Sequence, residues 1–372
     1  MTLKVSQLGI VADDLTGACN VASCFAPFVG MVRVCVTTDN VLINQSNLMV
    51  INTQSRLMSP EKSRIVIQEI GKVLGEKQVI FKKIDSAMRG HVGSEIEGLI
   101  EAVGSCRVIV APALPAIGRT TSLGVQYDNG IPIDKTEYAK DPASPIRSAC
   151  IRELLGKTAA ICRIADASVD GDLREIVEKG IDGTKVVFVG SLGLAAALTS
   201  QLETESWKKP QAPTARHPMI VCGSAYSRSR SQIEYAASQC DLIDWPQDMT
   251  ENRIRSISMD RPVVVRLAGN STCNASLGVA ELLSRFTDAV MSLIRRFNPD
   301  GLGVIGGETA FDLLRKLNAN NLNIYGHISE VIAYGLIADG MMGGRPFTAK
   351  GGSVGHDDAV IRMLDYLYKG KT

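Results

Sequence analysis

Short runs of β-branched and other apolar residues alternate with stretches of helical periodicity, and this alternation restricts the fold more than any other feature of the chain. Such runs predict buried strands, and helices between them are typical of a mainly parallel sheet covered by helices. In the first half the runs are residues 8–12, 31–37, 48–52, 78–81, 107–110 and 185–189. The fold class that we expect is therefore α/β.

One helix of this pattern is predicted to begin after residue 59. Ser59 suits the N-cap, Pro60 the first helical position and Glu61 the first turn. Four apolar residues follow at helical spacing and should form the face that covers the sheet. They are Val66, Ile70, Val73 and Leu74.

A segment near residue 210 is rich in proline and charge and fits neither period. It predicts a linker at 207–217, between an N-terminal domain (1–206) and a C-terminal domain (218–372). A chain of 372 residues also exceeds the usual size of one hydrophobic core. We expect a ligand-binding cleft between the two domains, each built on a mainly parallel sheet. The pattern restarts with strands at 219–221 and 262–267 and a helix at 277–297.

Charge and cysteine content exclude several classes of function. Forty basic and 39 acidic residues leave a net charge of +1, which gives no global field to attract nucleic acid or a membrane surface. The nine cysteines form no Cys-x-x-Cys pair, so reduced thiols are expected, and the four histidines lack metal-ligand spacing. The chain shows no signal-peptide pattern and no apolar run near ~18 residues. We expect a cytoplasmic protein without a metal-ligating side-chain cluster, and a homodimer is compatible with the sequence.

Polar or glycine-containing clusters follow four predicted strands of the first half, where open α/β sheets bind ligands. The first, residues 12–18, contains Asp13 and Asp14. Adjacent carboxylates can accept hydrogen bonds from a hydroxylated substrate, or one can take a hydroxyl proton as general base. For one aspartate alone, a helix N-cap is the favoured interpretation. For the whole segment we favour a site.

The second and fourth clusters are less specific. Arg56, in residues 52–56, could hold a carboxylate with a bidentate fork, although most arginines are solvated. Residues 111–119 form a proline-rich, rigid loop that could shape the same cleft. Neither cluster alone predicts a function.

The third cluster, residues 82–90, combines cations with an aspartate and a hydroxyl at a strand end. Lys83 and Arg89 beside Asp85 make an anion pocket plausible. A solvated charge run explains Lys82 better than it explains Arg89 and the glycine that follows it. We therefore expect Arg89, rather than Lys82, at the site.

Three glycine turns stand in the second half, at residues 223–227, 306–309 and 350–355. Glycine lets backbone amides approach an oxyanion, and the helix that opens at 307 adds a favourable dipole. One such turn is usually only a turn, but three in one small domain favour a nucleotide site. A Walker motif is absent, because Ile151 stands where the first glycine of a Walker motif ending at residues 156–158 should be.

Taken together, the motifs resemble the four-carbon acid sugar kinase family, over nearly the whole chain and in the family's order. The matching segments are 12–18, 55–56, 83–86 with 89–90, 112–115 with 118–119, 223–224, 306–309 and 350–352. The resemblance implies an N-terminal domain that binds a sugar acid and a C-terminal domain that binds ATP. It also implies transfer of the γ-phosphoryl group, with Mg²⁺, to the terminal hydroxyl of a tetronate such as threonate or erythronate. Ala87, Ile305 and Val354 depart from the family pattern, in which threonine, serine and phenylalanine are usual.

The motifs and the resemblance give a set of expected site residues. The expected acid contacts are Asp13, Arg56, Lys83, Ile84, Asp85, Ser86 and Arg89. The expected nucleotide contacts are Ser224, Gly306, Gly307, Glu308, Thr309, Lys350, Gly351 and Gly352. Asp14, Asp13 and Asp85 compete as the catalytic carboxylate, and we favour the Asp13-Asp14 pair because Lys83 or Arg89 could hold Asp85.

Two other functions remain open. A non-catalytic sensor could bind a sugar acid or a nucleotide without turnover. A phosphohydrolase could use the Asp13-Asp14 pair, although the aspartates of haloacid dehalogenase-like phosphatases are separated by one residue and these are adjacent. ATP-dependent product formation distinguishes the kinase from both.

Overall fold

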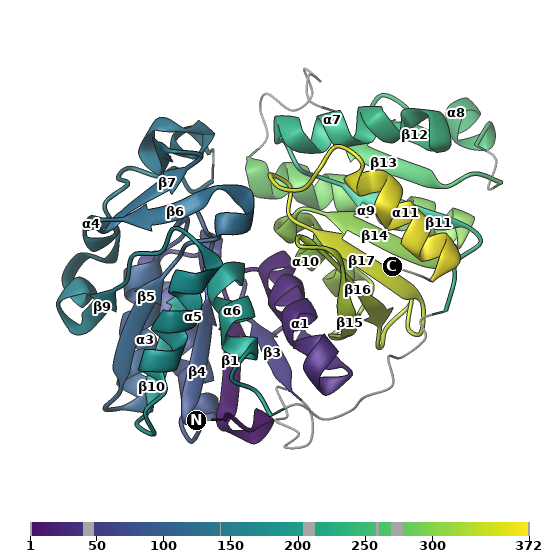
Figure 1. Ribbon diagram of the computed structural model, residues 1–372. Coiled ribbons are helices and arrows are strands. Elements are labelled where there is room, and N and C mark those ends of the chain that lie inside the picture. The colour runs from purple at the N-terminus through teal and green to yellow at the C-terminus, as the bar shows by residue number, and fades with distance from the viewer. Residues whose placement is uncertain are drawn as a thin grey trace. The chain divides into compact units, whose positions relative to one another are not determined.

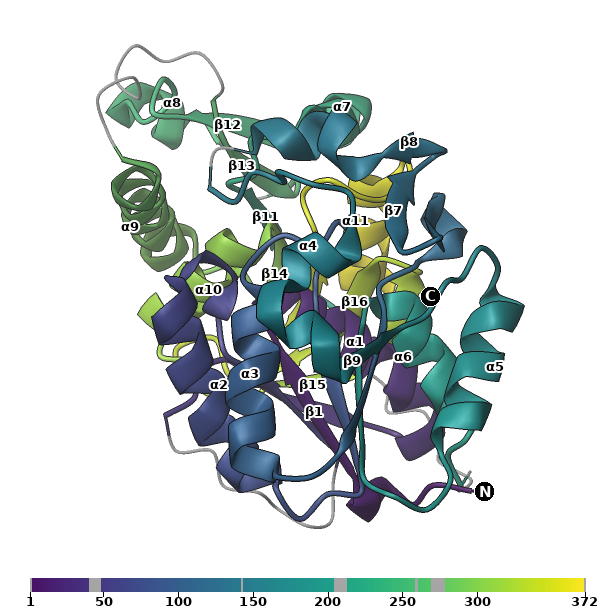
Figure 2. The same cartoon turned by 90° about the vertical axis from the view of Figure 1, so that its left-hand side faces the viewer.

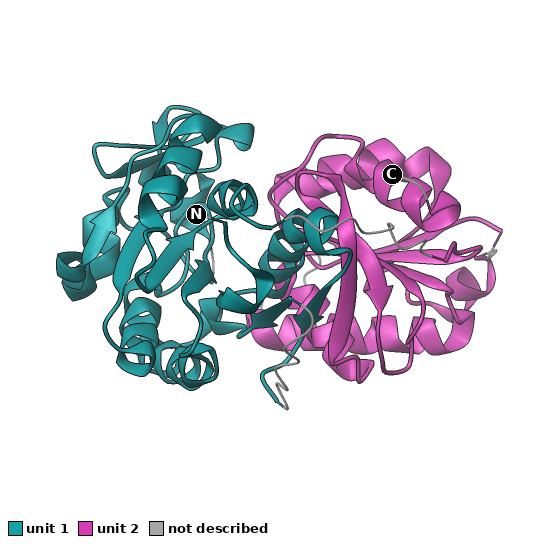
Figure 3. Cartoon of the chain, turned by 60° about the horizontal axis from the view of Figure 1, so that its bottom comes forward, with its two compact units in different colours: residues 1–208 teal, residues 209–372 magenta. Residues whose placement is uncertain are grey.

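The computed structural model describes residues 2–39, 48–141, 143–203, 213–257, 260–268 and 278–370 (Figure 1). The chain divides into two compact units, residues 1–208 (unit 1) and 209–372 (unit 2), coloured separately in Figure 3. Residues 207–212 of the predicted linker, and Cys273, lie outside the described residues. The eight described cysteines are all free thiols.

Unit 1 is built on a sheet whose seven described strands are all parallel. In spatial order they are β2 (Val32–Cys35), β3 (Met49–Asn52), β1 (Leu8–Ala12), β4 (Val79–Lys83), β10 (Val186–Gly190), β5 (Arg107–Ala111) and β9 (Cys162–Ile164). Six of them lie where the apolar runs predicted strands. The short strand β9 has only three residues and carried no such signal.

Helices cover both faces of this sheet (Figure 3). One group is α1 (Leu15–Val29), α5 (Asp170–Gly180) and α6 (Leu192–Thr199), in which α6 contacts both others. The second group is α2 (Pro60–Leu74), α3 (Val92–Val103) and α4 (Ile151–Leu155), with α2 and α3 side by side in Figure 2. A small antiparallel sheet that the sequence did not predict adds β6 (Arg119–Ser122), β7 (Val125–Asp128) and β8 (Ile131–Pro132).

Helix α2 begins as predicted, but its buried face is displaced. The Ser59 hydroxyl accepts a hydrogen bond from the Lys62 N–H, and Pro60 is the first helical residue. Ile67, Ile70 and Leu74 are buried, whereas Val73, predicted to be on this face, is 40% exposed. Of the four residues predicted to lie on this face, Ile70 and Leu74 are buried, and Ile67 is buried where Val66 was expected.

Unit 2 has a mixed sheet. In spatial order its strands are β12 (Asp241–Trp245), β13 (Val263–Leu267), β11 (Pro218–Cys222), β14 (Gly301–Ile305), β17 (Pro346–Lys350), β16 (Ile332–Ile337) and β15 (Asn321–Ser329). The first five are parallel, and β16 runs antiparallel to both β17 and β15. The mainly parallel sheet that we predicted is therefore correct for five of its strands, with an antiparallel hairpin added.

Helices also cover both faces of the unit 2 sheet (Figure 3). Helix α7 (Ser227–Ala236) contacts α11 (Ala359–Lys369), and α9 (Val279–Phe297) contacts α10 (Gly307–Lys316). The short helix α8 (Glu251–Arg255) follows β12. Helix α9 buries Phe286, Val290 and Ile294, three of the residues at helical spacing in its sequence. No helix among the described residues has the length and apolarity needed to cross a membrane.

Candidate active site

The carboxyl ends of five neighbouring strands of unit 1 lie in one row. The register pairs Ala12 of β1 with both Asn52 of β3 and Lys83 of β4. Gly190 of β10 is paired with Lys83 and with Ala111 of β5. Because the strands are parallel, the segments that follow them leave the sheet at the same edge. The four clusters predicted from the sequence follow β1, β3, β4 and β5, so the register brings them together.

Arg56 binds both aspartates that follow β1. Its Nε donates to Asp13 Oδ2 at 2.8 Å and its Nη2 to Asp13 Oδ1 at 3.0 Å, which is a bidentate fork. The same Nη2 donates to Asp14 Oδ1 at 2.6 Å. The Arg56 backbone N–H donates to the Asp13 carbonyl at 3.2 Å. The predicted fork is present, but its acceptor is a carboxylate of the protein.

Asp14 is the N-cap of α1. Its Oδ1 accepts from the Gly17 N–H at 3.0 Å, and its Oδ2 accepts from the Thr16 hydroxyl at 2.7 Å. The N-cap interpretation that we weighed for a single aspartate therefore describes Asp14. Asp13 makes no cap and is 1% exposed, with both oxygens on Arg56.

Opposing effects act on the Asp13 carboxyl. Burial raises its pKa, but the nearby charges of Arg56, Lys82 and Lys83, with the Arg56 hydrogen bonds, outweigh burial and hold the pKa below its ordinary value. Asp13 is therefore ionised at neutral pH. A carboxylate that is ionised and fixed in direction can accept a hydrogen bond from a hydroxyl.

Lys83 lies beside the two aspartates. Its buried Nζ donates to the Ile84 carbonyl at 2.7 Å, and a Cβ placed on Gly17 would lie only 3.0 Å from that Nζ. Burial lowers the pKa of Lys83, and the attraction of Asp13 and Asp14 offsets this only in part. The ammonium group is therefore held against the first turn of α1, where glycine leaves room for it.

Lys82 is buried rather than solvated, so the surface interpretation of this residue is wrong. It is 0% exposed and forms a 2.9 Å ion pair with Glu95 of α3, which is 1% exposed. The Ser55 hydroxyl donates to the second oxygen of Glu95, and it lies 2.9 Å from the Thr53 hydroxyl. Glu95 thus links β4 to the turn Ser55–Leu57 that carries Arg56. The sequence did not distinguish Glu95 from Glu97 and Glu101 of the same helix.

Asp85 is held by Arg89, as we considered from the sequence. Arg89 Nε donates to Asp85 Oδ2 at 2.7 Å and Nη2 to Oδ1 at 3.0 Å. Burial raises the pKa of Asp85, but Arg89 and Arg56 hold it well below its ordinary value. Arg89 also bonds Asp141 at 3.0 Å and lies over the Tyr138 ring. Asp85 is therefore a weaker base than an unpaired aspartate, and the fork of Arg56 has the same effect on Asp13.

The small sheet and the turn after it supply contacts that the sequence did not predict, although Arg119 itself belongs to the predicted cluster 111–119. Arg119, 4% exposed, donates to the Tyr138 hydroxyl at 2.7 Å and pairs with Asp128 at 3.1 Å. The Ser86 carbonyl accepts from the Gln126 amide at 2.9 Å. These contacts depend on β6 and β7, so no linear motif could have indicated them.

Ile84 and Ala87 contribute through the backbone and the core. Ile84 is 0% exposed and its N–H donates to the Gly190 carbonyl at 2.9 Å. Ala87 is 1% exposed. Both side chains are buried inside unit 1. Through its N–H bond to Gly190, Ile84 fixes the position of the adjacent residues Lys83 and Asp85.

The three glycine turns of unit 2 also begin in one row. The register pairs Cys222 of β11 with Ile305 of β14, and Ile305 with Lys350 of β17. The turns at 223, 306 and 351 therefore leave three adjacent parallel strands at one edge. Helix α10 begins at this edge, and its N-cap residue is Gly306, which provides no side-chain cap.

Ser224 and Thr309 join the turns. A Cβ placed on Gly223 would lie 2.3 Å from Thr309 Oγ1, and one on Gly352 would lie 2.2 Å from Ser224 Oγ. Gly306 has φ +107°, and its Cβ would lie 3.4 Å from Thr309 Oγ1. The glycines are thus required by close approach and by backbone conformation. Together they form a cradle of main-chain atoms of the kind that binds phosphate groups.

Lys350 faces inward from this cradle. It is 0% exposed, and its Nζ donates to the carbonyls of Gly351 at 2.7 Å and Val354 at 2.9 Å. Burial lowers its pKa to about 8. Of the positions that depart from the family pattern, Ile305 is buried in the core and Val354 packs against it.

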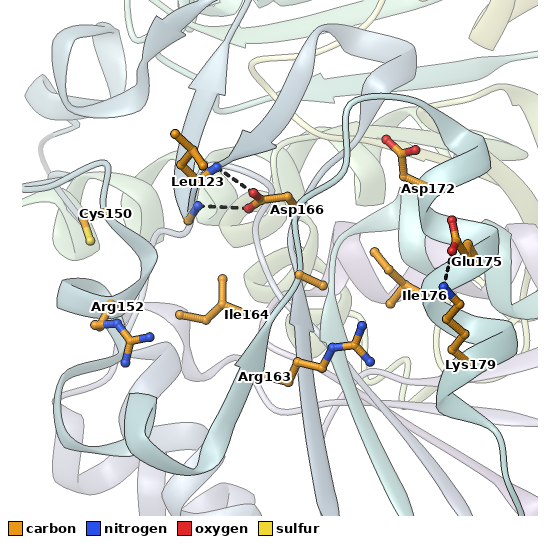
Figure 4. Close-up of a pocket in the computed structure, with 12 residues that line it drawn as sticks. Leu123, Cys150, Arg152, Arg163, Ile164, Asp166, Asp172, Glu175, Ile176 and Lys179 are labelled. Carbon is orange, nitrogen blue, oxygen red and sulfur yellow. Dashed lines mark hydrogen bonds and ion pairs between the residues drawn. The ribbon is translucent and has the colours of Figure 1, made fainter.

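A groove of about 540 Å³ lies elsewhere in unit 1 and contains none of the predicted site residues (Figure 4). Arg152, Arg163 and Lys179 contribute its basic groups, and Lys179 pairs with Glu175. Its Asp166 accepts hydrogen bonds from the N–H groups of the β6–β7 turn. Among the residues that the structure describes, no group of three or more His, Cys, Asp or Glu side chains could hold a metal ion.

Two family models match the chain, one in each unit. A model described as a sugar-binding N-terminal domain matches residues 8–164, and one described as a nucleotide-binding C-terminal domain matches residues 219–360. The first match covers the ion pairs that Arg56, Lys82 and Arg89 form in unit 1. The second covers all three glycine turns.

Three similar proteins align over nearly their whole length. The chain is 27% identical to a D-erythronate kinase of Heliobacterium modesticaldum, over 98% of this chain and 97% of that protein. It is 26% identical to a D-threonate kinase of Bordetella bronchiseptica, over 97% of both. A D-threonate kinase of Salmonella typhimurium is 24% identical, over 96% of this chain and 97% of that protein.

Two solved structures share the fold. One, from Salmonella typhimurium LT2, gives a TM-score of 0.72 at 18% identity and covers 96% of this chain and 98% of that one. The other, a Haemophilus influenzae protein of DUF1537, gives a TM-score of 0.65 at 17% identity, over 96% and 100%. At this identity the likeness concerns the fold alone.

Proposed function

The chain belongs to the four-carbon acid sugar kinase family, with its sugar-binding N-terminal and nucleotide-binding C-terminal domains, and from this premise we propose an activity. The protein transfers the γ-phosphoryl group of ATP to the terminal hydroxyl of a four-carbon sugar acid of the threonate or erythronate type. Relatives named as kinases of D-erythronate and D-threonate, aligned over nearly the whole chain, support this substrate class.

The structural observation that carries the proposal is the convergence of the three glycine turns at the ends of β11, β14 and β17. Phosphoryl transfer requires the protein mainly to position the phosphates and to stabilise their charge. Backbone amides of Gly306, Gly307 and Gly352, with the start of α10, suit that role. Ser224 and Thr309, which join the turns, can donate hydroxyl hydrogen bonds. ATP supplies the phosphoryl group, and Mg²⁺ accompanies it, since Mg²⁺ binds chiefly through substrate phosphates and one or two carboxylates.

Unit 1 supplies the binding site of the acid in this proposal. Lys83 and Arg89 provide positive charge for the substrate carboxylate. Arg56 fixes the direction of Asp13, so its first role is to orient a catalytic carboxylate. Asp13, ionised and without a capping role, accepts the hydrogen bond or the proton of the attacking hydroxyl. Asp14 holds the start of α1 and shares Arg56 with Asp13.

An ADP-release assay with a panel of four-carbon acids tests the proposal. ADP formation that requires both an acid and Mg²⁺-ATP, with a phosphorylated product detected by mass spectrometry, is the expected result. Acid binding without turnover would favour the sensor instead. Phosphate release from phosphoesters without ATP would favour the phosphohydrolase.

A further inference from the structure

The loop that follows β17 accepts hydrogen bonds from side chains of helix α7. Five of its backbone carbonyls accept hydrogen bonds from side chains. Ser229 of α7 donates to the Gly352 carbonyl at 2.6 Å, and Arg228 Nε donates to the Gly355 carbonyl at 2.7 Å. The Gln232 amide nitrogen lies 3.2, 3.0 and 2.9 Å from the carbonyl oxygens of residues 354, 355 and 356, so its two N–H groups serve three acceptors and one of them is shared. Lys350 takes the carbonyls of residues 351 and 354.

The directions of these carbonyls determine the directions of the N–H groups that follow them in the loop. In a planar trans peptide the carbonyl of one residue and the N–H of the next point in opposite directions. Carbonyls 351, 352, 354, 355 and 356 point toward α7 and Lys350, so the N–H groups of residues 352, 353, 355, 356 and 357 point away from them. A loop arranged in this way presents successive N–H groups on one side, which is the geometry of an anion-binding nest.

The donor that holds most of the loop is Gln232. It is 0% exposed, and its Oε1 accepts no hydrogen bond within the described residues. The opposite orientation of the amide would place that oxygen against three carbonyl oxygens, so the contacts determine which atom is the nitrogen. Leaving the Oε1 acceptor of a buried amide unsatisfied costs free energy, so the contacts of the amide nitrogen with the three carbonyls must offset that cost.

We propose that Gln232, Ser229 and Arg228 of α7, with Lys350, are positioning residues that turn the amides of the 351–357 loop toward the phosphates of the bound nucleotide. The inference rests on the proposed kinase function and assigns α7 a part in it. It also changes the role expected for Lys350, from a phosphate contact to a brace on the inner side of the loop. Gly352 remains the residue of the loop that approaches Ser224 closely.

Two replacements of Gln232 test the brace. Gln232→Met keeps the length of the side chain and removes the donor, and we expect the KM for ATP to rise about tenfold, the scale of one or two lost hydrogen bonds. Gln232→Glu puts a carboxylate oxygen opposite three carbonyls and should be worse at pH 8. At pH 6 a protonated carboxyl can donate one hydrogen bond, so the KM should move back toward wild type. The Met variant should show no such recovery.

Ser231→Ala, an exposed position on the same helix, is the matched control and should leave the KM for ATP within about twofold of wild type. The KM for the acid should be unchanged in all three variants. Equal KM values for ATP in wild type and both Gln232 variants would overturn the inference. A defect of Gln232→Glu that is the same at pH 6 and pH 8 would overturn the donor role.

Hydrogen exchange of the nucleotide-free protein separates positioning from contact. In Gln232→Met and Lys350→Met we expect faster exchange of the amides of residues 352–357 than in wild type and Ser231→Ala. If Lys350→Met weakens ADP binding while the loop exchanges at the wild-type rate, Lys350 contacts the phosphate and its role as a brace is wrong. Wild-type protein that binds no ADP in calorimetry and releases none with any acid would reject the kinase function itself, which is a different outcome.

Discussion

The two units differ in the groups that stand at the carboxyl ends of their parallel strands. In unit 1 the edge carries buried charged side chains that neutralise one another, among them Asp13, Lys82, Lys83 and Glu95. In unit 2 the edge consists of glycine backbone. Among the described residues of unit 2, Lys350 is the one charged residue that is buried. Substitutions that remove charge should therefore affect unit 1 most, and those that add a Cβ should affect unit 2 most.

The largest effect is expected from Asp13→Asn, which should lower kcat by about 10² or more, within the range of general-base catalysis. Asp14→Asn should lower kcat less, because Asp14 caps α1 and acts on Asp13 only through Arg56. Asparagine keeps the size of the side chain and removes the charge. The Km for the acid should change less, and steady-state kinetics with saturating ATP provide the measurement. Near wild-type kcat in both variants, beside a low kcat in Asp85→Asn, would make Asp85 the base and reject the assignment.

Arg56→Ala and Arg89→Ala should each reduce kcat/KM for the acid by an amount equivalent to about 1.5–3 kcal/mol, the scale of hydrogen bonds to charged groups. Arg89→Ala should act mainly on the KM for the acid. Arg56→Ala should also lower kcat, because it leaves Asp13 without the fork that orients it. The KM for ATP should stay within about twofold in both. Wild-type acid kinetics in either variant would remove that arginine from the site.

The Asp85–Arg89 pair should make part of the stability of unit 1 depend on acid pH. The folded pKa of Asp85 lies below its ordinary value of 3.8, so the stabilisation is fully present above pH 3.8 and is lost as pH falls toward the folded pKa. Asp85→Asn should lower the free energy of unfolding at pH 6 by about 1–2 kcal/mol. The difference from wild type should shrink below pH 3.8 in urea titrations. A difference that is constant from pH 6 to pH 2.5 would contradict the cause given for the pKa.

The smallest effect concerns the glycines of unit 2, where neighbouring positions provide a matched pair. Gly352→Ala places a Cβ 2.2 Å from Ser224 Oγ, whereas at Gly351 the nearest atom, a methyl carbon of Val354, is 3.2 Å away. We expect Gly352→Ala to raise the KM for ATP about tenfold, the scale of a tight packing conflict, and Gly351→Ala to raise it less. Titration of ATP at saturating acid measures both. Equal KM values in the two variants would show that close approach to Ser224 is not what requires glycine.

Local patterns in the sequence determined the α/β fold class and most strand positions. The runs at 8–12 and 48–52 became β1 and β3 because apolar β-branched residues favour a buried strand whatever the partner strand is. The start of α2 at Pro60 was also predictable, since a cap and a first-turn proline act within one turn of helix. The three glycine turns could be recognised as loops for the same reason.

The tertiary structure alone decided which charges meet. The sequence indicated a surface lysine at Lys82, but Lys82 is buried in an ion pair with Glu95, which lies outside its local segment and also accepts a hydrogen bond from Ser55. Arg56 read as a ligand for a substrate carboxylate, and strand register placed it on Asp13 instead. The brace of Gln232 on the 351–357 loop joins residues more than 100 positions apart. Periodicity reports the burial of one segment at a time, whereas these contacts depend on which strands are neighbours, and that is fixed only when the whole sheet has formed.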